Sequence, residues 1–78
     1  MDLASTEERV TSVIRTALHI HDITTPLSMG ATPGWDSLGH MSVILALERE
    51  FGVRVPLVRI PELVDVASIS RALTSEMK

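Results

Sequence analysis

The sequence contains no cysteine and no tyrosine, and Trp35 and Phe51 are its only tryptophan and phenylalanine. Without cysteine, the chain can form neither disulfide bonds nor thiolate metal sites, and any thiol chemistry must come from an added group. Hydrophobic residues nevertheless make up 45% of the sequence. We therefore expect a core of leucine, isoleucine, valine and alanine side chains packed between helices.

Basic residues are also scarce, with seven lysines and arginines against ten aspartates and glutamates, and a net charge of −3. Nucleic-acid binding needs a basic face, so this balance argues against it. The apolar stretch over residues 41–47 is too short to span a bilayer, and residues 1–10 lack the pattern of a secretion signal. We expect one domain, residues 1–78, in the form of a cytoplasmic monomer.

Apolar residues at helical spacing predict a first helix over residues 5–20, followed by a long loop. Ser5 and Glu8 fit the S-x-x-E capping box, in which each side chain accepts a hydrogen bond from a backbone N–H at the helix start. Prolines and glycines between residues 26 and 34 then argue against regular structure. The predicted buried stripe comprises Val10, Val13, Ile14, Ala17 and Leu18, and the predicted loop anchors are Ile23, Leu27 and Trp35.

A second helix is predicted over Ser37–Phe51, with Asp36 as its N-cap and Gly52 as its C-terminal stop. No charged residue occurs between Leu38 and Leu47, and the apolar residues follow two stripes at helical spacing. A domain of this size cannot cover both stripes. One stripe comprises Val43, Ile44, Leu47 and Phe51, and the other Leu38, Met41 and Leu45, so we expect one stripe to be buried and the other to be offered to a partner.

Residues 53–78 predict an extended connection followed by two more helical segments. Val53, Val55 and Pro56 have no second strand to pair with, so we expect no sheet. A short helical turn is predicted over residues 61–64, with Pro61 in its first turn, and a last helix follows the N-cap Asp65. Its predicted buried face comprises Val66, Ile69, Ala72, Leu73 and Met77. The predicted fold is all-α: a small four-helix bundle of three main helices and one short helix, with a long first loop.

Ser37 lies where the glycine-rich loop ends and the second helix begins, and three roles compete for it. A catalytic serine needs a base and a group that orients the base; His40 lies at i+3, but no carboxylate is placed to orient it. A simple helix start explains Ser37 but not the apolar stripe beside it. An acceptor of a phosphate-linked group explains both the serine and the stripe. A helix N-terminus favours a phosphate, and the apolar stripe would dock an enzyme that works on the attached group. We expect His40 to be a neutral surface residue.

Residues 35–56, WDSLGHMSVILALEREFGVRVP, resemble the phosphopantetheine attachment region of acyl and peptidyl carrier proteins. The D-S-L core lies at Asp36, Ser37 and Leu38, and ALEREFGVRVP is similar to the family's L-E-x-x-F-x-[VI]-x-[VI]-P pattern. The likeness extends over the whole chain in length and in the order of the predicted helices. It implies an acyl-carrier-protein-like fold and a protein that performs no catalysis itself.

In that family, a phosphopantetheinyl transferase moves 4′-phosphopantetheine from coenzyme A to the serine hydroxyl, which is Ser37 here. The transferase supplies the base and the Mg²⁺, and the thiol of the arm carries acyl or aminoacyl groups as thioesters between loading and processing enzymes. The resemblance implies partner contacts beside the motif residues Asp36 and Ser37, at Leu38, Met41, Leu45 and Glu48. The alternative is a helical protein–protein interaction module without a prosthetic group.

The stretch after Ser37 differs from that of many fatty-acid carriers, whose second helix is strongly acidic. Here Gly39, His40 and Ser42 are neutral, and Arg49, Arg54 and Arg59 are basic. Electrostatic steering should therefore be weaker. We expect a carrier in a specialised pathway, such as polyketide, nonribosomal peptide or surface-polymer assembly. No metal site is expected, because His19 and His21 point apart at i, i+2 and lack a third ligand.

Overall fold

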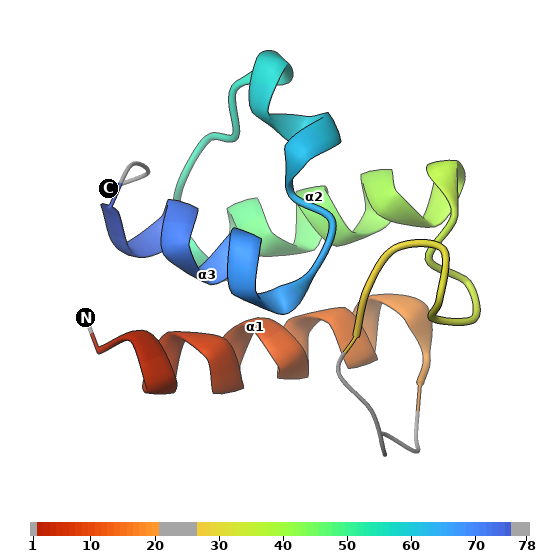
Figure 1. The fold of residues 1–78 in the computed structure, drawn as a ribbon, viewed down its shortest axis with the longest axis horizontal. Helices are drawn as coiled ribbons and strands as arrows, with labels where there is room; N and C mark the ends of the chain where they lie inside the picture. The colour runs from red at the N-terminus through yellow and green to blue at the C-terminus, as the bar shows by residue number, and fades with distance from the viewer. Residues whose placement is uncertain (1, 21–26, 76–78) are drawn as a thin grey trace.

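The computed structural model describes residues 2–20 and 27–75, which form three α-helices and one 3₁₀ helix (Figure 1). The helices are α1 (Leu3–Leu18), α2 (Ser37–Phe51), the 3₁₀ helix η1 (Leu57–Glu62) and α3 (Val66–Ser75). Those two ranges contain no strand, only an isolated antiparallel bridge between Ser28 and Asp65. The predicted all-α bundle of three main helices and one short helix is therefore confirmed.

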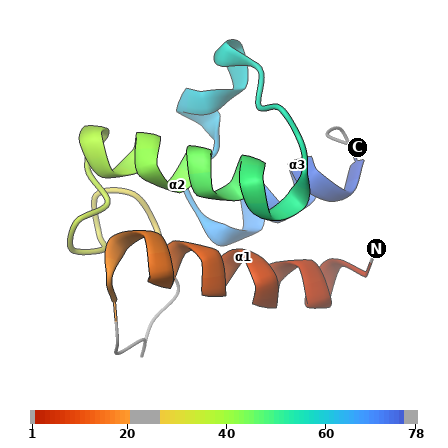
Figure 2. The same ribbon diagram turned by 180° about the vertical axis from the view of Figure 1, so that it is seen from behind.

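α1 is the helix that the other two long helices share, since both α2 and α3 pack against it. α1 and α2 lie side by side and run in opposite directions, and η1 lies beyond α2 on the side away from α1 (Figure 1, Figure 2). Within the described ranges, no helix combines the length and the apolar character that crossing a bilayer would need. One face of α2, with Leu38, Met41 and Leu45, remains exposed to solvent.

The start of α1 differs from the prediction. The helix begins at Leu3 with Asp2 as its N-cap, and Asp2 Oδ2 accepts from the Ser5 N–H at 3.3 Å and from the Ser5 hydroxyl at 3.2 Å. Ser5 therefore lies inside the first turn, and the predicted capping box of Ser5 with Glu8 is wrong. Asp2 can cap one turn earlier because its carboxylate accepts the same kind of bond and also suits the positive end of the helix dipole.

The end of α1 is set by His19, which adopts the left-handed conformation at φ 56°. Its N–H points back to the carbonyl oxygens of Arg15 and Thr16, which closes the last turn. The helix therefore ends at Leu18, two residues before the predicted Ile20. His19 is exposed, and His21 lies outside the described residues.

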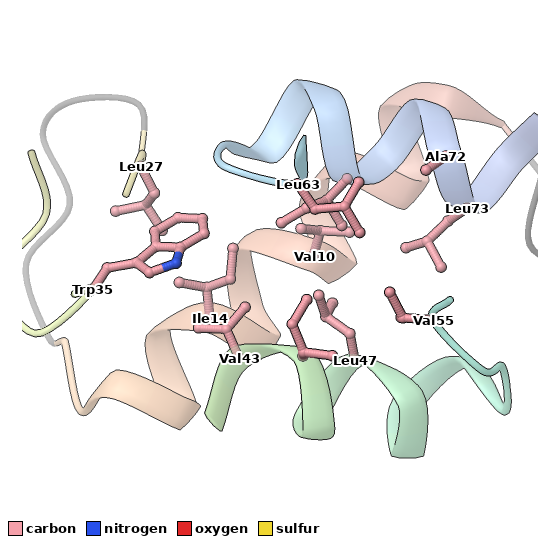
Figure 3. Packing of buried hydrophobic residues seen from close by; sticks show 12 residues of the cluster. Val10, Ile14, Leu27, Trp35, Val43, Leu47, Val55, Leu63, Ala72 and Leu73 are labelled. Carbon is pink, nitrogen blue, oxygen red and sulfur yellow. The ribbon is translucent and has the colours of Figure 1, made fainter. Parts of the chain in front are cut away.

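The core lies between the three α-helices and also receives side chains from the loops (Figure 3). Leu27 and Trp35 extend into it from the loop before α2, as predicted, while Ile23 lies outside the described residues. The buried hydrophobic side chains are Val10, Ile14, Leu27, Trp35, Val43, Ile44, Leu47, Val55, Leu63, Ile69, Ala72 and Leu73.

The predicted inward faces of the helices are largely confirmed, and their margins are half-buried. Phe51 is an example, since the Arg9 guanidinium lies 4.4 Å from the centre of its ring and covers part of it. Arg9 also pairs with Glu50 at 3.1 Å, which ties α1 to the end of α2. The half-buried members are Val13, Ala17, Leu18, Phe51 and Val66, and Met77 lies outside the described residues.

η1 begins four residues before the predicted helical turn. Its first residue is Leu57, and the preceding Pro56 carbonyl accepts the Arg59 N–H at 2.9 Å. The predicted range 61–64 is therefore wrong, and Pro61 lies inside η1 instead of in its first turn. A short 3₁₀ helix tolerates this proline because its locked φ is compatible with the helix and only one donor is lost. None of the six residues of η1 is buried.

α3 begins directly after Asp65, as predicted. Asp65 Oδ1 accepts the Ser68 N–H at 2.7 Å, and the Asp65 N–H donates to the Ser68 hydroxyl oxygen at 3.2 Å. This reciprocal pair is a capping box in which Ser68 takes the place of the usual glutamate. Hydrogen bonds from Ser68 hold the pKa of Asp65 below its usual value. The bond from the Ser68 N–H has the larger effect, and the bond from the Ser68 hydroxyl has the smaller one.

Candidate functional site

The loop before α2 is held by its own backbone hydrogen bonds. The Ser28 carbonyl accepts the Thr32 N–H at 3.0 Å, and the Ser28 N–H donates to the Thr32 hydroxyl oxygen at 3.0 Å. Trp35 closes the turn, because its N–H donates to the Thr32 carbonyl and its own carbonyl accepts the Gly30 N–H, both at 3.0 Å. The Met29 N–H donates to the Val64 carbonyl at 2.7 Å. The residues leading to Ser37 are therefore anchored on the chain that enters α3.

Gly39 marks the point where this loop touches α2. A Cβ added to Gly39 would overlap the Gly34 carbonyl oxygen and would lie 3.2 Å from Leu18 Cδ2. The backbone of Gly34, at φ 85°, therefore lies directly against the first turn of α2. Only glycine fits at this contact, since the obstacle is backbone and cannot rotate away.

Ser37 is the first residue of α2, and its side chain is exposed. Asp36 is the N-cap, as predicted, and its Oδ1 accepts the Gly39 N–H at 2.8 Å. In the described part of the chain, no residue forms a hydrogen bond with the Ser37 hydroxyl. The hydroxyl is therefore accessible at the positive end of a 15-residue helix.

His40 is buried, with 5% of its surface exposed, so its predicted surface position is wrong. Trp35 Nε1–H donates to His40 Nδ1 at 2.8 Å, and His40 Nε2 lies 2.8 Å from the Ile60 carbonyl oxygen. The two rings lie 6.1 Å apart at an interplanar angle of 25°. Because Trp35 and Ile60 come from other segments that wrap around α2, nothing within α2 itself signals that His40 is buried.

The partners of His40 determine its tautomer. The Trp35 indole can only donate, so Nδ1 must be the acceptor and carries no proton. The Ile60 carbonyl can only accept, so Nε2 must carry the proton and donate. Only the neutral Nε2–H form makes both bonds. Both ring nitrogens are thus bonded to Trp35 and Ile60, and Ser37 and His40 do not form a hydrogen-bonded pair.

Beside Ser37, three apolar side chains of α2 are exposed, as predicted. Leu38 is 83% exposed, Met41 44% and Leu45 51%, and we call these three residues the α2 stripe. η1 adds Leu57 and Val58, which are 82% and 78% exposed. The sequence gives no signal for the exposure of these two residues, because consecutive apolar residues between prolines carry no helical period.

Glu48 lies near the end of α2 and is half-buried. Its Oε2 accepts the Val55 N–H at 2.8 Å, which ties the C-terminal part of α2 to the extended segment before η1. The carboxylate therefore has a structural partner, and its contact with a partner protein stays a prediction. Among the residues that the structure describes, no three histidine, cysteine, aspartate or glutamate side chains come together in a way that could hold a metal ion.

Comparison of the chain with protein-family models, with curated proteins and with solved structures gave no match. The function of the protein must therefore be inferred from the exposed Ser37 hydroxyl, the loop that positions it and the α2 stripe beside it.

Proposed function

We propose that this protein is a carrier that bears 4′-phosphopantetheine on Ser37 and presents acyl or aminoacyl groups to partner enzymes. The observation that supports it most is the exposed Ser37 at the start of α2, set between a hydrogen-bonded loop and the α2 stripe. A serine that only began a helix would not account for a contiguous apolar face next to it.

Ser37 fits a phosphate-linked arm in its exposure and its position. The free N–H groups and the dipole of α2 favour a phosphate at this helix end. In the transfer, the Ser37 oxygen forms a bond to the coenzyme A phosphorus that carries pantetheine. The bond from this phosphorus to 3′,5′-adenosine bisphosphate breaks, and the transferase base takes the Ser37 proton. When attached, the arm supplies a terminal thiol that holds the cargo as a thioester.

The residues around Ser37 position it, and none of those that the structure describes is arranged as a base for the transfer. Asp36 holds the first turn of α2 through the Gly39 N–H, and Gly34 packs against that turn. His40 uses both ring nitrogens in bonds to Trp35 and Ile60. This arrangement supports a substrate of a transferase, which brings its own base, and not a serine hydrolase.

The α2 stripe is the surface that partner enzymes would meet. It lies on the same helix as Ser37 and presents Leu38, Met41 and Leu45 without a charged residue among them. Glu48 borders it as the acidic contact. Shape and apolar contacts would then determine which partner binds more than long-range electrostatic attraction would. This character supports a carrier in a specialised pathway, such as polyketide, nonribosomal peptide or surface-polymer assembly.

Incubation with coenzyme A, Mg²⁺ and a broad-specificity phosphopantetheinyl transferase, followed by intact-protein mass spectrometry, tests the proposal. We expect a mass gain of one phosphopantetheine in the unaltered protein and none in Ser37→Ala. Ser42→Ala is the matched control, because Ser42 is an exposed serine on the same helix and should leave the gain intact. A protein that gains no mass would instead be an interaction module without a prosthetic group. A gain that survives Ser37→Ala would refute Ser37 as the attachment site.

A further inference from the structure

The hydrogen bonds from Trp35 to His40 and from His40 to Ile60 join three separate segments of the chain. Trp35 ends the loop, His40 lies in the first turns of α2, and Ile60 lies in η1. Both bonds are 2.8 Å long. The Trp35 indole N–H donates to His40, and His40 in turn donates to the Ile60 carbonyl of η1. The two hydrogen bonds therefore run in the same direction and reinforce each other.

η1 packs on the core through Ile60. None of its residues is buried, and only Ile60 and Arg59 are half-buried. It lies on the side of α2 away from α1 (Figure 1, Figure 2). A short helix with so little buried area depends strongly on single polar contacts for its position.

His40 also lies close to Ser37 along α2. Residues at i and i+3 of a helix are surface neighbours, so the bond to Ile60 brings η1 next to the part of α2 that carries Ser37. η1 exposes Leu57 and Val58 to solvent.

From this geometry we infer that Trp35 and His40 are positioning residues that hold η1 beside Ser37 for recognition by the enzyme that modifies it. Trp35 selects the tautomer of His40, and the resulting Nε2–H holds η1 through the Ile60 carbonyl. The recognition part of this inference depends on the proposed function. The structural part, the hold of His40 on η1, does not.

Two variants of His40 separate the two bonds. Asparagine can place an amide oxygen where Nδ1 lies and accept from Trp35, but it is too short to reach Ile60. Glutamine can place an amide N–H where Nε2 lies and donate to Ile60, but it leaves Trp35 without its acceptor. His40→Asn and His40→Gln each remove the ring and one bond, so each is the control for the other in overall stability.

Amide hydrogen exchange measured by NMR tests the hold on η1 directly. The reporters are the N–H groups of Arg59 and Leu63, which donate to Pro56 and Ile60. Loss of one hydrogen bond should speed their exchange about fivefold in His40→Asn relative to His40→Gln. Equal exchange in the two variants would overturn the inference, as would ring ¹⁵N shifts that show the Nδ1–H tautomer in the unaltered protein.

Transferase kinetics test the recognition. For His40→Asn we expect a KM for the carrier about fivefold higher than for His40→Gln, with kcat within about twofold. Equal KM values, or a fall confined to kcat, would overturn the recognition role. If the unaltered protein accepts no phosphopantetheine at all, the proposed function fails and the recognition role fails with it, while the exchange rates still uphold or overturn the hold of His40 on η1.

Discussion

Gly39→Ala should destabilise the protein, although alanine is the better helix former. On intrinsic propensity alone, alanine inside a helix would add about 1 kcal/mol of stability. Here the new methyl group would overlap the Gly34 carbonyl oxygen and press on Leu18 Cδ2 at 3.2 Å. The oxygen belongs to the backbone, so no rotamer change relieves the overlap, and the end of the loop must move away from α2.

The loss in the free energy of unfolding can be worked out from the contacts that this movement of the loop disturbs. Displacing Gly34 loosens the bonds from the Trp35 N–H to Thr32 and from the Gly30 N–H to Trp35, both 3.0 Å. Two such bonds contribute about 2 kcal/mol together, and overpacking adds about 1–3 kcal/mol. After the propensity gain is subtracted, the net loss should be about 2–4 kcal/mol.

Urea unfolding followed by far-ultraviolet circular dichroism measures this loss. Ser42→Ala is the matched control, because it adds helix propensity at an exposed position of α2 and should change stability by no more than about 0.5 kcal/mol. Modification of Ser37 should also slow in Gly39→Ala, since the loop that leads to Ser37 is displaced. A Gly39→Ala protein as stable as the unaltered one would refute the close approach of Gly34 to α2.

Three further outcomes are expected. The buried Ser70 hydroxyl has no hydrogen-bond partner among the described residues, so Ser70→Ala should raise the unfolding free energy by about 0.5–2 kcal/mol in urea titrations; a loss would show that the hydroxyl is bonded. The pKa of Asp65 is lowered in the folded protein from 3.8, chiefly by the Ser68 N–H. Its stabilising contribution is therefore complete above that value and is lost as pH falls through the lower folded pKa, so Asp65→Asn should flatten the acid side of the stability profile; an unchanged profile would contradict this. Met41→Glu should change stability by no more than about 0.5 kcal/mol because Met41 is 44% exposed, yet modification of Ser37 should slow; a large loss of stability would place Met41 in the core.

The limits of α2 were predictable because its signals are local. Asp36 reaches the Gly39 N–H three residues on, and Gly52 ends the helix in the left-handed conformation at φ 64°. The two stripes of α2 follow from helical spacing and from the size of the domain. The prediction of the start of α1 was wrong for an equally local reason. Aspartate and serine are both favoured N-cap residues, so the sequence pattern does not show whether Asp2 or Ser5 caps the helix.

The surroundings of Ser37 depend on contacts between segments that are distant in the sequence. The sequence by itself determined the helical fold, the position of Ser37 at a helix start and the exposed apolar face beside it, because these depend on spacing and on neighbours within one turn. The tertiary structure alone decided that His40 is buried, since its partner Ile60 lies 20 residues away. An imidazole can leave water only where other segments supply both a donor and an acceptor, and no local pattern shows that they do.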